Sequence, residues 1–394
     1  MTRPEPLDVL VTGGGIAGTV AAVAFASRGF ATALLDPDPP RRPGGAYAPR
    51  VSSINPASES LLAGTGIWRL VQRGRVSPFE RIEVFTDDGA QAVAFDAADA
   101  GLAHLACIVE NDLVAAAARE RLDEMADSHA LPAAALAEMR RAGELTEVVT
   151  TTGDTLACRL LVAADGADST VRRLAGIGRD VFDYRQQAVV ARVVPERHHG
   201  ATARQKFLAA GPLAFLPLAD GSCSIVWSLD NESAAGVMSL DDAAFADRLE
   251  REFDGRLGRI LECERRYAFA LRRAHARRYY ADGVALVGDA CHTVHPLAGL
   301  GANQGVADAA TLADAASRAR DAGQRFFAER VLATYQRRRR PANRAVLAAM
   351  DLFHLGFAGE PSLPAELAAR LMRLADASAT AKRFFIRRAG GLAP

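Results

Sequence analysis

Residues 8–18 read Asp-Val-Leu-Val-Thr-Gly-Gly-Gly-Ile-Ala-Gly. The first five residues are mostly apolar and predict a short strand, and the glycines after them predict a tight turn. Residues 19–27 are rich in alanine and helical in pattern, and residues 32–35 predict a second buried strand. The order of strand, glycine turn, helix and strand predicts a βαβ unit.

The glycine spacing in this unit predicts a site for a dinucleotide. Gly13, Gly15 and Gly18 supply a sharp turn, a close approach for a pyrophosphate and tight packing of helix on strand, while Ile16 and Ala17 open the helix. Asp36 stands 18 residues after Gly18, where a carboxylate accepts hydrogen bonds from an adenosine ribose and repels a 2′-phosphate. A core turn that binds nothing is the weaker alternative, because strand, glycines, helix and acid all agree.

Composition narrows the class of protein. The chain has 394 residues, enough for two or three structural units, and 49% hydrophobic residues, which excludes extensive disorder. Lys plus Arg and Asp plus Glu both total 47, so no net charge attracts nucleic acid. The five cysteines have no metal-binding spacing and indicate reduced thiols in the cytoplasm. No apolar run is long enough for a membrane span, which leaves peripheral membrane contact open.

The rest of the chain alternates between two sequence patterns. Residues 160–164 and 284–287 are continuous apolar runs, typical of parallel strands that are covered on both faces. Residues 181–276 and the short piece 82–85 alternate and carry turn signals, which predicts an antiparallel sheet. From residue 302 onward the pattern is helical, with a break expected at Arg337–Arg340 and Pro341. The predicted fold class is therefore α/β: a Rossmann-like domain, an inserted antiparallel-sheet domain and a C-terminal helical region.

These two sequence patterns divide the chain into segments. The nucleotide-binding domain is expected at 1–75, 101–180 and 277–342, the substrate domain at 76–100 and 181–276, and the C-terminal helical region at 343–394.

Two further aspartates follow buried strands. Asp165 and Asp289 each stand at a strand end, where ligands of open parallel sheets bind, but an aspartate there is as often a helix cap. After Asp289, Gly299 and Gly301 permit close approach of a flat ligand just before a helix begins. If that ligand is an isoalloxazine ring, the helix amides and dipole stabilise the negative charge of its reduced form.

Four motifs together resemble one family. The sequence is similar to the flavoprotein aromatic hydroxylases of p-hydroxybenzoate hydroxylase fold, and most closely to the hydroxylases of ubiquinone biosynthesis. The motifs are Gly13-x-Gly15-x-x-Gly18, Asp165-Gly166-x-x-Ser169-x-x-Arg172, Gly288-Asp289-Ala290-x-His292 and His295-Pro296-Leu297-Ala298-Gly299-x-Gly301-x-Asn303-x-Gly305-x-x-Asp308. Leu300 departs from the Gln found in many relatives, and Asp36 departs from the usual Glu.

The resemblance implies FAD as the cofactor. It places the pyrophosphate on the glycine motif, the adenosine ribose on Asp36, the ribityl chain on Asp289, and Arg50 near the phosphates or the flavin. Asp165 and Gly166 are associated with FAD and nicotinamide binding. The flavin ring is expected against Pro296, Gly299, Leu300, Gly301, Ala302 and Asn303. With a single dinucleotide motif, NAD(P)H is a visiting co-substrate.

The resemblance also implies the reaction. Reduced flavin reacts with O2 to a C4a-hydroperoxide that hydroxylates an electron-rich ring, so no protein nucleophile is needed. The expected substrate is a prenylated phenol in ubiquinone biosynthesis. A small soluble aromatic of secondary metabolism and a non-catalytic flavoprotein scaffold in a biosynthetic complex stay as alternatives.

The sheet-based segment offers an apolar substrate pocket. Leu213, Phe215 and Pro217 or their neighbours, with Trp227 nearby, are expected to face the flavin. His292 and His295 lack partners at ligand spacing, so no metal is expected. Near the C-terminus, Phe384 and Phe385 stand among basic residues, which leaves a membrane-touching surface open alongside a plain packed helix. Association with a biosynthetic complex and a homo-oligomer are likewise left open.

Overall fold

The computed structural model describes residues 5–39, 42–87, 90–131, 133–294, 300–357 and 379–392. The predicted βαβ unit is present as β1 (Leu7–Thr12), α1 (Ile16–Ala26) and β2 (Thr32–Leu35). β1 pairs in parallel with β2 on one side and with β11 (Thr155–Ala163) on the other. The chain therefore has the mixed α/β fold that the sequence predicts.

The first sheet carries the strand ends that matter for the site. Its order is β18-β19-β11-β1-β2-β8, and β9 and β10 extend β11 as an antiparallel hairpin. The remaining strands are β8 (Ser128–Ala130), β9 (Leu136–Ala142), β10 (Leu145–Thr150), β18 (Tyr280–Ala281) and β19 (Val284–Leu286). Because β1, β2, β11 and β19 are mutually parallel, their carboxyl ends meet at one edge.

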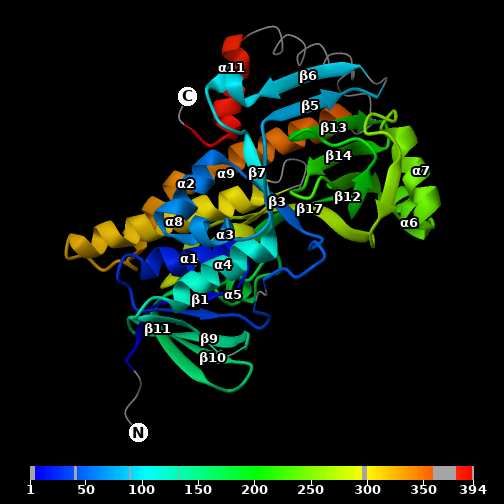
Figure 1. The fold of residues 1–394 in the computed structure, drawn as a ribbon. Helices are drawn as coiled ribbons and strands as arrows, with labels where there is room; N and C mark the ends of the chain where they lie inside the picture. Colours follow the sequence, from blue (N-terminus) through cyan, green and yellow to red (C-terminus); the bar gives the residue numbers. More distant parts are fainter. Residues whose placement is uncertain are drawn as a thin grey trace.

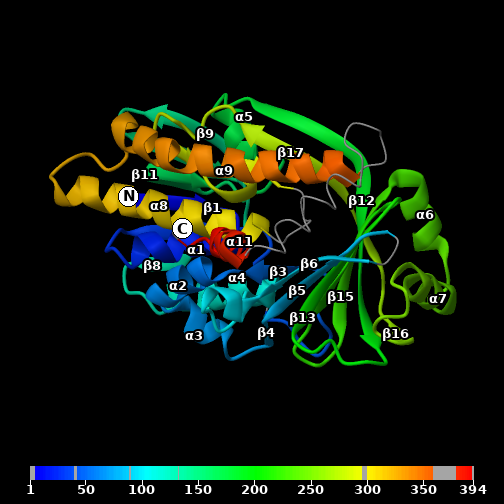
Figure 2. The same cartoon turned by 90° about the horizontal axis from the view of Figure 1, so that it is seen from above.

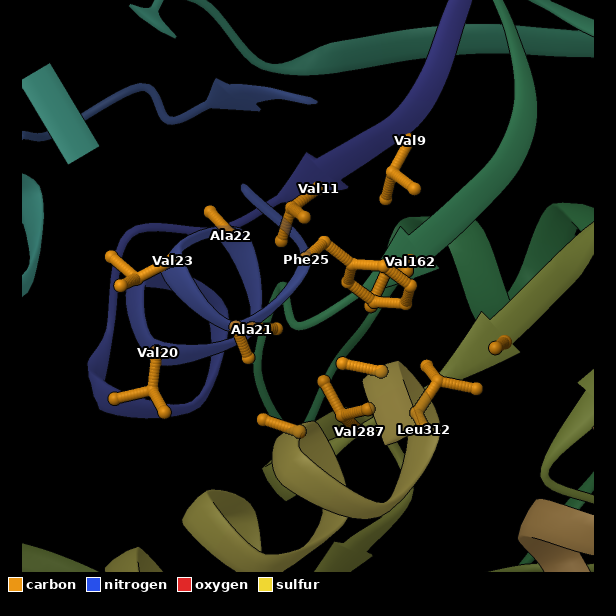
Figure 3. Packing of buried hydrophobic residues seen from close by; sticks show 14 of the residues in the cluster. Val9, Val11, Val20, Ala21, Ala22, Val23, Phe25, Val162, Val287 and Leu312 are labelled. Atoms are coloured by element: carbon orange, nitrogen blue, oxygen red, sulfur yellow. The ribbon is translucent and has the colours of Figure 1, made fainter. Parts of the chain in front are cut away.

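The main core lies between this sheet and the helices on it. Val11 of β1, Val162 of β11 and Phe25 of α1 pack together with Leu312 from a much later helix (Figure 3). The strand residues are fully buried, which explains why their sequences are continuously apolar.

The second sheet is mostly antiparallel, with the order β20-β17-β12-β15-β14-β13-β5-β6 and β16 beside β12. Its strands are β5 (Arg81–Phe85), β6 (Gln91–Asp96), β12 (Arg179–Pro195), β13 (Thr202–Leu208), β14 (Gly211–Pro217), β15 (Cys223–Asp230), β16 (Ile260–Cys263), β17 (Tyr267–Ala276) and β20 (His292–Thr293). One pairing differs from the prediction: β5 runs parallel to β13, because it arrives from a distant earlier segment.

Helices cover the sheets in separate groups. α6 (Asn231–Ser239) and α7 (Asp242–Glu252) lie on one face of the second sheet, at the far end of the molecule from the other helices (Figure 2). The other helices are α1, α2 (Pro56–Gly64), α3 (Ile67–Val71), α4 (Asn111–Asp123), α5 (Thr170–Leu174), α8 (Leu300–Asp321), α9 (Glu329–Phe357) and α11 (Ala379–Ala389), with short 3-10 turns η1 (Ala97–Ala100) and η2 (Gly288–Ala290). A small sheet of β3 (Val51–Ile54), β7 (Ala106–Glu110) and β4 (Val76–Phe79) lies between the two halves.

The expected break at Arg337–Pro341 is absent. α9 is continuous from Glu329 to Phe357 with Pro341 inside it. Its first half packs on α8, and Tyr335 and Asn343, which flank Pro341, are both buried, so tertiary packing outweighs the missing amide. The segment boundary expected at 342/343 falls inside this helix. Within the ranges given above, no helix is long and apolar enough to cross a bilayer.

Candidate active site

A cavity of about 2250 Å³ joins the parallel strand ends of the first sheet to one face of the second sheet. Most of the predicted cofactor residues line it. They are Gly13, Gly15, Ile16, Ala17, Asp36, Arg50, Asp165, Gly166, Asp289, Gly301, Ala302 and Asn303. Pro296 and Gly299 lie outside the described residues, as does the side chain of Leu300, the first residue of α8.

The glycines of the turn have different tasks. A Cβ on Gly18 would lie 1.8 Å from the Gly13 carbonyl oxygen, so Gly18 allows α1 to pack on the turn. A Cβ on Gly15 would meet no atom within 4 Å, so the space beside Gly15 stays open to the cavity. α1 begins there without a side-chain cap or an acidic residue in its first turn. This helix end is suited to hold a pyrophosphate.

Asp36 borders the cavity and contains a buried acceptor without a partner in the described part of the chain. Its side chain is buried, and its Oδ2 atom has no hydrogen-bond partner among the described residues. Burial raises the pKa of the carboxyl, while backbone amides at Gly14 and Asp38 partly oppose the shift. A Cβ on Gly14 would lie 1.8 Å from Asp36 Oδ2, so a larger residue at this position would displace the Asp36 carboxylate. The hydroxyls of a ribose would supply the donors that this carboxylate lacks.

Asp165 is a helix cap. Its Oδ2 atom accepts hydrogen bonds from the backbone amides of Thr170 at 2.8 Å and Val171 at 3.1 Å, at the start of α5. Ser169 donates its hydroxyl to Asp165 Oδ1 at 2.5 Å. Of the two roles that the sequence left open, the carboxylate takes the structural one, while the backbone of Asp165 and Gly166 still borders the cavity.

Asp289 is in a different situation. Its side chain is accessible from the cavity but surrounded by protein, and this burial raises the pKa of its carboxyl, with His292 and Arg50 acting in the opposite direction. The Arg50 side chain is exposed and lines the same cavity. Glu110, almost fully buried, holds the loop before Arg50 by accepting the Ala48 amide at 2.7 Å.

A buried ionic network under the Asp289 loop was not predicted. Asp308 of α8 is fully buried, and it accepts hydrogen bonds from His292 Nε2 at 2.5 Å and Arg339 Nε at 2.7 Å. It also accepts the Gly288 amide at 3.2 Å, and Asn343 donates to its second oxygen at 3.2 Å. The pKa of Asp308 is lowered to about 2, because burial is outweighed by His292 and Arg339. His292 is thus held by Asp308, directly before Thr293 of the cavity lining, whereas His295 lies outside the described residues.

Asn303 and Arg172 fix neighbouring loops to one another. Asn303 Nδ2 donates to the Ser53 carbonyl at 2.7 Å, and its Oδ1 accepts the Asn55 amide at 3.0 Å, which ties the start of α8 to β3. Arg172 is buried and donates to the carbonyls of Ala167 at 2.9 Å and Ala290 at 3.1 Å. The loops that follow β11 and β19 are therefore bridged by one guanidinium.

The far end of the cavity is apolar, but the predicted pocket residues face the other way. Leu213, Phe215 and Trp227 belong to the core under α6 and α7, and Pro217 is buried on the same face of β14. The alternate residues line the cavity: Pro212, Ala214 and Leu216 of β14 and Ser224, Val226 and Ser228 of β15. The prediction allowed for neighbouring residues, and the neighbours Ala214 and Leu216 are the ones that line the cavity, whereas the bulkier side chains named first, Leu213 and Phe215, fill the core.

Other segments complete this apolar end. Ile82 and Phe95 come from β5 and β6, Ile108 from β7, and Phe385 and Ile386 from α11. Thr293 also lines it, and its Oγ1 atom is buried with no hydrogen-bond partner in the described ranges. The cavity therefore has one end rich in glycine, backbone amides and carboxylates, and another end lined mainly by apolar side chains, with Ser224 and Ser228 among them. Arg204, Gln205 and Arg272 of the second sheet also line the cavity.

Comparison with known proteins agrees with this geometry. The model of the FAD binding domain family matches residues 6–350. The 3-demethoxyubiquinol 3-hydroxylase of Escherichia coli strain K12 is 35% identical over 355 residues, covering 90% of this chain and 90% of that protein. The ubiquinone hydroxylase UbiL of Rhodospirillum rubrum is 35% identical over 386 residues, covering 98% and 89%. The structure of Pseudomonas aeruginosa PqsL with 2-aminobenzoylacetate shares the fold, with a TM-score of 0.79, 24% identity and coverage of 90% and 97%.

The fold and the site thus define a flavoprotein monooxygenase acting on an aromatic ring. The chain belongs to the FAD binding domain family, and its cofactor is FAD, with NAD(P)H as the co-substrate typical of the family. The open space at Gly15 and the unsatisfied Asp36 oxygen fit the phosphates and ribose of that cofactor.

Proposed function

We propose that this chain hydroxylates the ring of a prenylated phenol in ubiquinone biosynthesis. The observation that carries the proposal is the apolar wall of the cavity, from Ala214 and Val226 on the second sheet to Ile386 on α11. An isoprenoid tail has no polar group to satisfy, so such a wall suits it. The names of the relatives from Escherichia coli and Rhodospirillum rubrum support the same substrate class.

The residues of the glycine-rich end would hold the cofactor. Gly13, Gly15 and the start of α1 would receive the pyrophosphate, Asp36 the ribose and Asp289 the ribityl chain, while Gly301 and Ala302 would border the ring. Bound FAD, once reduced by NAD(P)H, activates O2 for insertion of one oxygen atom into the substrate ring.

The protein must place the phenol and keep water away. The apolar side chains around Ala214 and Val226 exclude water from the space beside the cofactor. Thr293 lines the cavity, but its Oγ1 atom is buried, so this hydroxyl is not assigned a contact with the phenol. Tail binding rests on the apolar wall.

A series of phenols with the same ring and tails of increasing length tests this proposal. Steady-state kinetics of the flavin-loaded protein should show KM falling with each isoprene unit until the wall is covered. A KM that does not depend on the tail, with efficient turnover of a small soluble phenol, would instead support the alternative of a soluble aromatic substrate. Absence of turnover with every phenol would support a non-catalytic scaffold.

Location and assembly complete the proposal. The chain would act in the cytoplasm at the membrane surface, where a prenylated phenol resides, within a biosynthetic complex or as a homo-oligomer. The intermediate that accumulates when the gene is deleted would identify the step: a phenol lacking one ring hydroxyl is expected.

A further inference from the structure

α11 connects the apolar end of the cavity to the outer surface. Ile386 is buried against Phe79, Leu105 and Ile108, and Phe385 lines the cavity beside it. The helix lies next to η1, from which it is far in sequence (Figure 1). α11 is therefore part of the wall around the proposed tail-binding end.

Several contacts fix α11 in this place. Asn55 Nδ2 donates to the Ala389 carbonyl at 3.0 Å, and the Ala57 amide donates to the Gly390 carbonyl at 3.1 Å. Arg383 Nε donates to the Asp99 carbonyl at 3.2 Å, on η1. The helix is thus held by its C-terminal end to α2 and along its length to η1.

The outer face of α11 combines an aromatic ring with positive charge. Phe384 is 50% exposed and does not line the cavity, so its ring points to the outside. Four basic residues, Lys382, Arg383, Arg387 and Arg388, flank the phenylalanines, and the helix contains no acidic residue. An aromatic ring within a basic helical face is typical of a helix that lies in the interface of an anionic bilayer.

We propose that α11 is the surface by which this protein docks on an anionic lipid bilayer, with Phe384 entering the interface and the basic residues facing the lipid headgroups. The positive charge of the helix complements the negative charge of such a bilayer. On its inner side, α11 forms part of the apolar wall of the cavity. Resting on the proposed function, the same contact would allow a prenylated phenol to pass from the bilayer to the cavity without exposing its tail to water.

Vesicle sedimentation of the flavin-loaded protein tests the docking surface without any substrate. Wild type should bind vesicles of phosphatidylcholine mixed with phosphatidylglycerol, bind pure phosphatidylcholine much less, and dissociate at high salt. The variant Phe384→Ser with Arg388→Ser should partition at least about fivefold less, the effect of one lost cation, while its flavin spectrum and thermal midpoint match wild type. The matched control, Leu261→Ser with Arg251→Ser, changes an exposed apolar and an exposed basic residue far from the cavity, and should bind as wild type.

Two results would overturn the docking proposal. One is equal binding of the α11 variant and wild type to the anionic vesicles. The other is a wild-type protein that does not bind the vesicles and whose molecular mass in solution shows that a second copy or another protein covers α11. Turnover of a short-tailed phenol in solution separates this proposal from the proposed function: the α11 variant should retain it, and only the KM for a long-tailed phenol in vesicles should rise. A wild type that binds vesicles but turns over neither phenol would contradict the function and leave the surface intact.

Discussion

At the scale of single residues, the glycine turn separates folding from binding. Gly18 is needed for the contact between α1 and the turn, while Gly15 borders open space. The spacing predicted a sharp turn, a close approach for a pyrophosphate and tight helix packing from the three glycines together, and the surrounding atoms place the tight packing at Gly18 and the open space at Gly15.

The variants Gly15→Ala and Gly18→Ala should therefore differ. The first should leave the free energy of unfolding of the FAD-free protein within about 1 kcal/mol of wild type and weaken FAD binding at least tenfold (about 1.4 kcal/mol), because its methyl group occupies the phosphate site. The second should cost about 1–3 kcal/mol of stability through overpacking. Flavin titration and urea unfolding measure both quantities. Equal effects of the two substitutions on FAD affinity and stability would contradict the division of roles.

Substitution of Asp308 should strongly lower the free energy of unfolding. Asp308→Asn leaves Arg339 without its buried counter-charge and His292 Nε2 without its carboxylate partner, and should cost about 3–5 kcal/mol. Asp314→Asn on the same helix removes a partly exposed partner of Arg318 and Arg338 and should cost less than about 1 kcal/mol. If urea unfolding gives both variants similar stability, the Asp308 network does not hold the Asp289 loop as described.

His275 should make the fold sensitive to acid. Its pKa falls from 6.5 to about 4, chiefly through burial, with His292, Arg340 and Arg344 adding to the shift and Asp180 opposing it. The unfolded chain therefore binds this proton at higher pH than the folded chain does. The stability contributed by neutral His275 is complete above 6.5 and is lost as pH falls toward about 4.

The slope due to this one group is at most about 1.4 kcal/mol per pH unit. His275→Gln keeps a partner for the Tyr279 hydroxyl and should flatten the pH dependence of unfolding in that window. An unchanged slope in the variant would show that His275 does not titrate differently in the folded and unfolded chains.

At the scale of elements, local patterns were sufficient for the βαβ unit but not for the orientation of β14. Alternation in a strand defines two faces without saying which one is covered by helices. A signal existed in residue size, since Leu213 and Phe215 pack under α6 and α7, whereas Ala214 leaves room for a ligand. The break expected at Pro341 was wrong for a similar reason. α9 is continuous there because it packs against segments that lie far away in the sequence. The ion pair between Arg339 and Asp308 could not be predicted either, because the two residues are 31 positions apart and belong to no common motif.

Neighbouring residues of β14 should therefore respond in opposite ways. Ala214→Leu should raise the KM for a prenylated phenol and leave stability nearly unchanged, because the added atoms enter the cavity. Leu213→Ala should cost about 2–5 kcal/mol by opening a void in the core, with little effect on KM once the protein is folded. Kinetics together with thermal unfolding decide this, and the reverse pattern would restore the original pocket prediction.

At the scale of the whole molecule, segments far apart in sequence surround one cavity. The glycine turn, the loops after β11 and β19, the face of β14 and β15, and α11 all reach it. The sequence pattern predicted the segments that form the second sheet, and their exact boundaries remain a prediction. The covering of the apolar end by α11 was not expected, because nothing local relates residues 379–389 to η1.

We infer that this cavity brings a flavin and a phenol ring together so that oxygen is transferred to the ring. The most direct test is the mass of the product formed by flavin-loaded protein with a prenylated phenol, NAD(P)H and isotopically labelled O2. The product should have gained a single labelled oxygen atom, and the consumption of NAD(P)H should match its formation. Folded, flavin-loaded protein that consumes NAD(P)H and releases only peroxide, with no label in the ring, would contradict it.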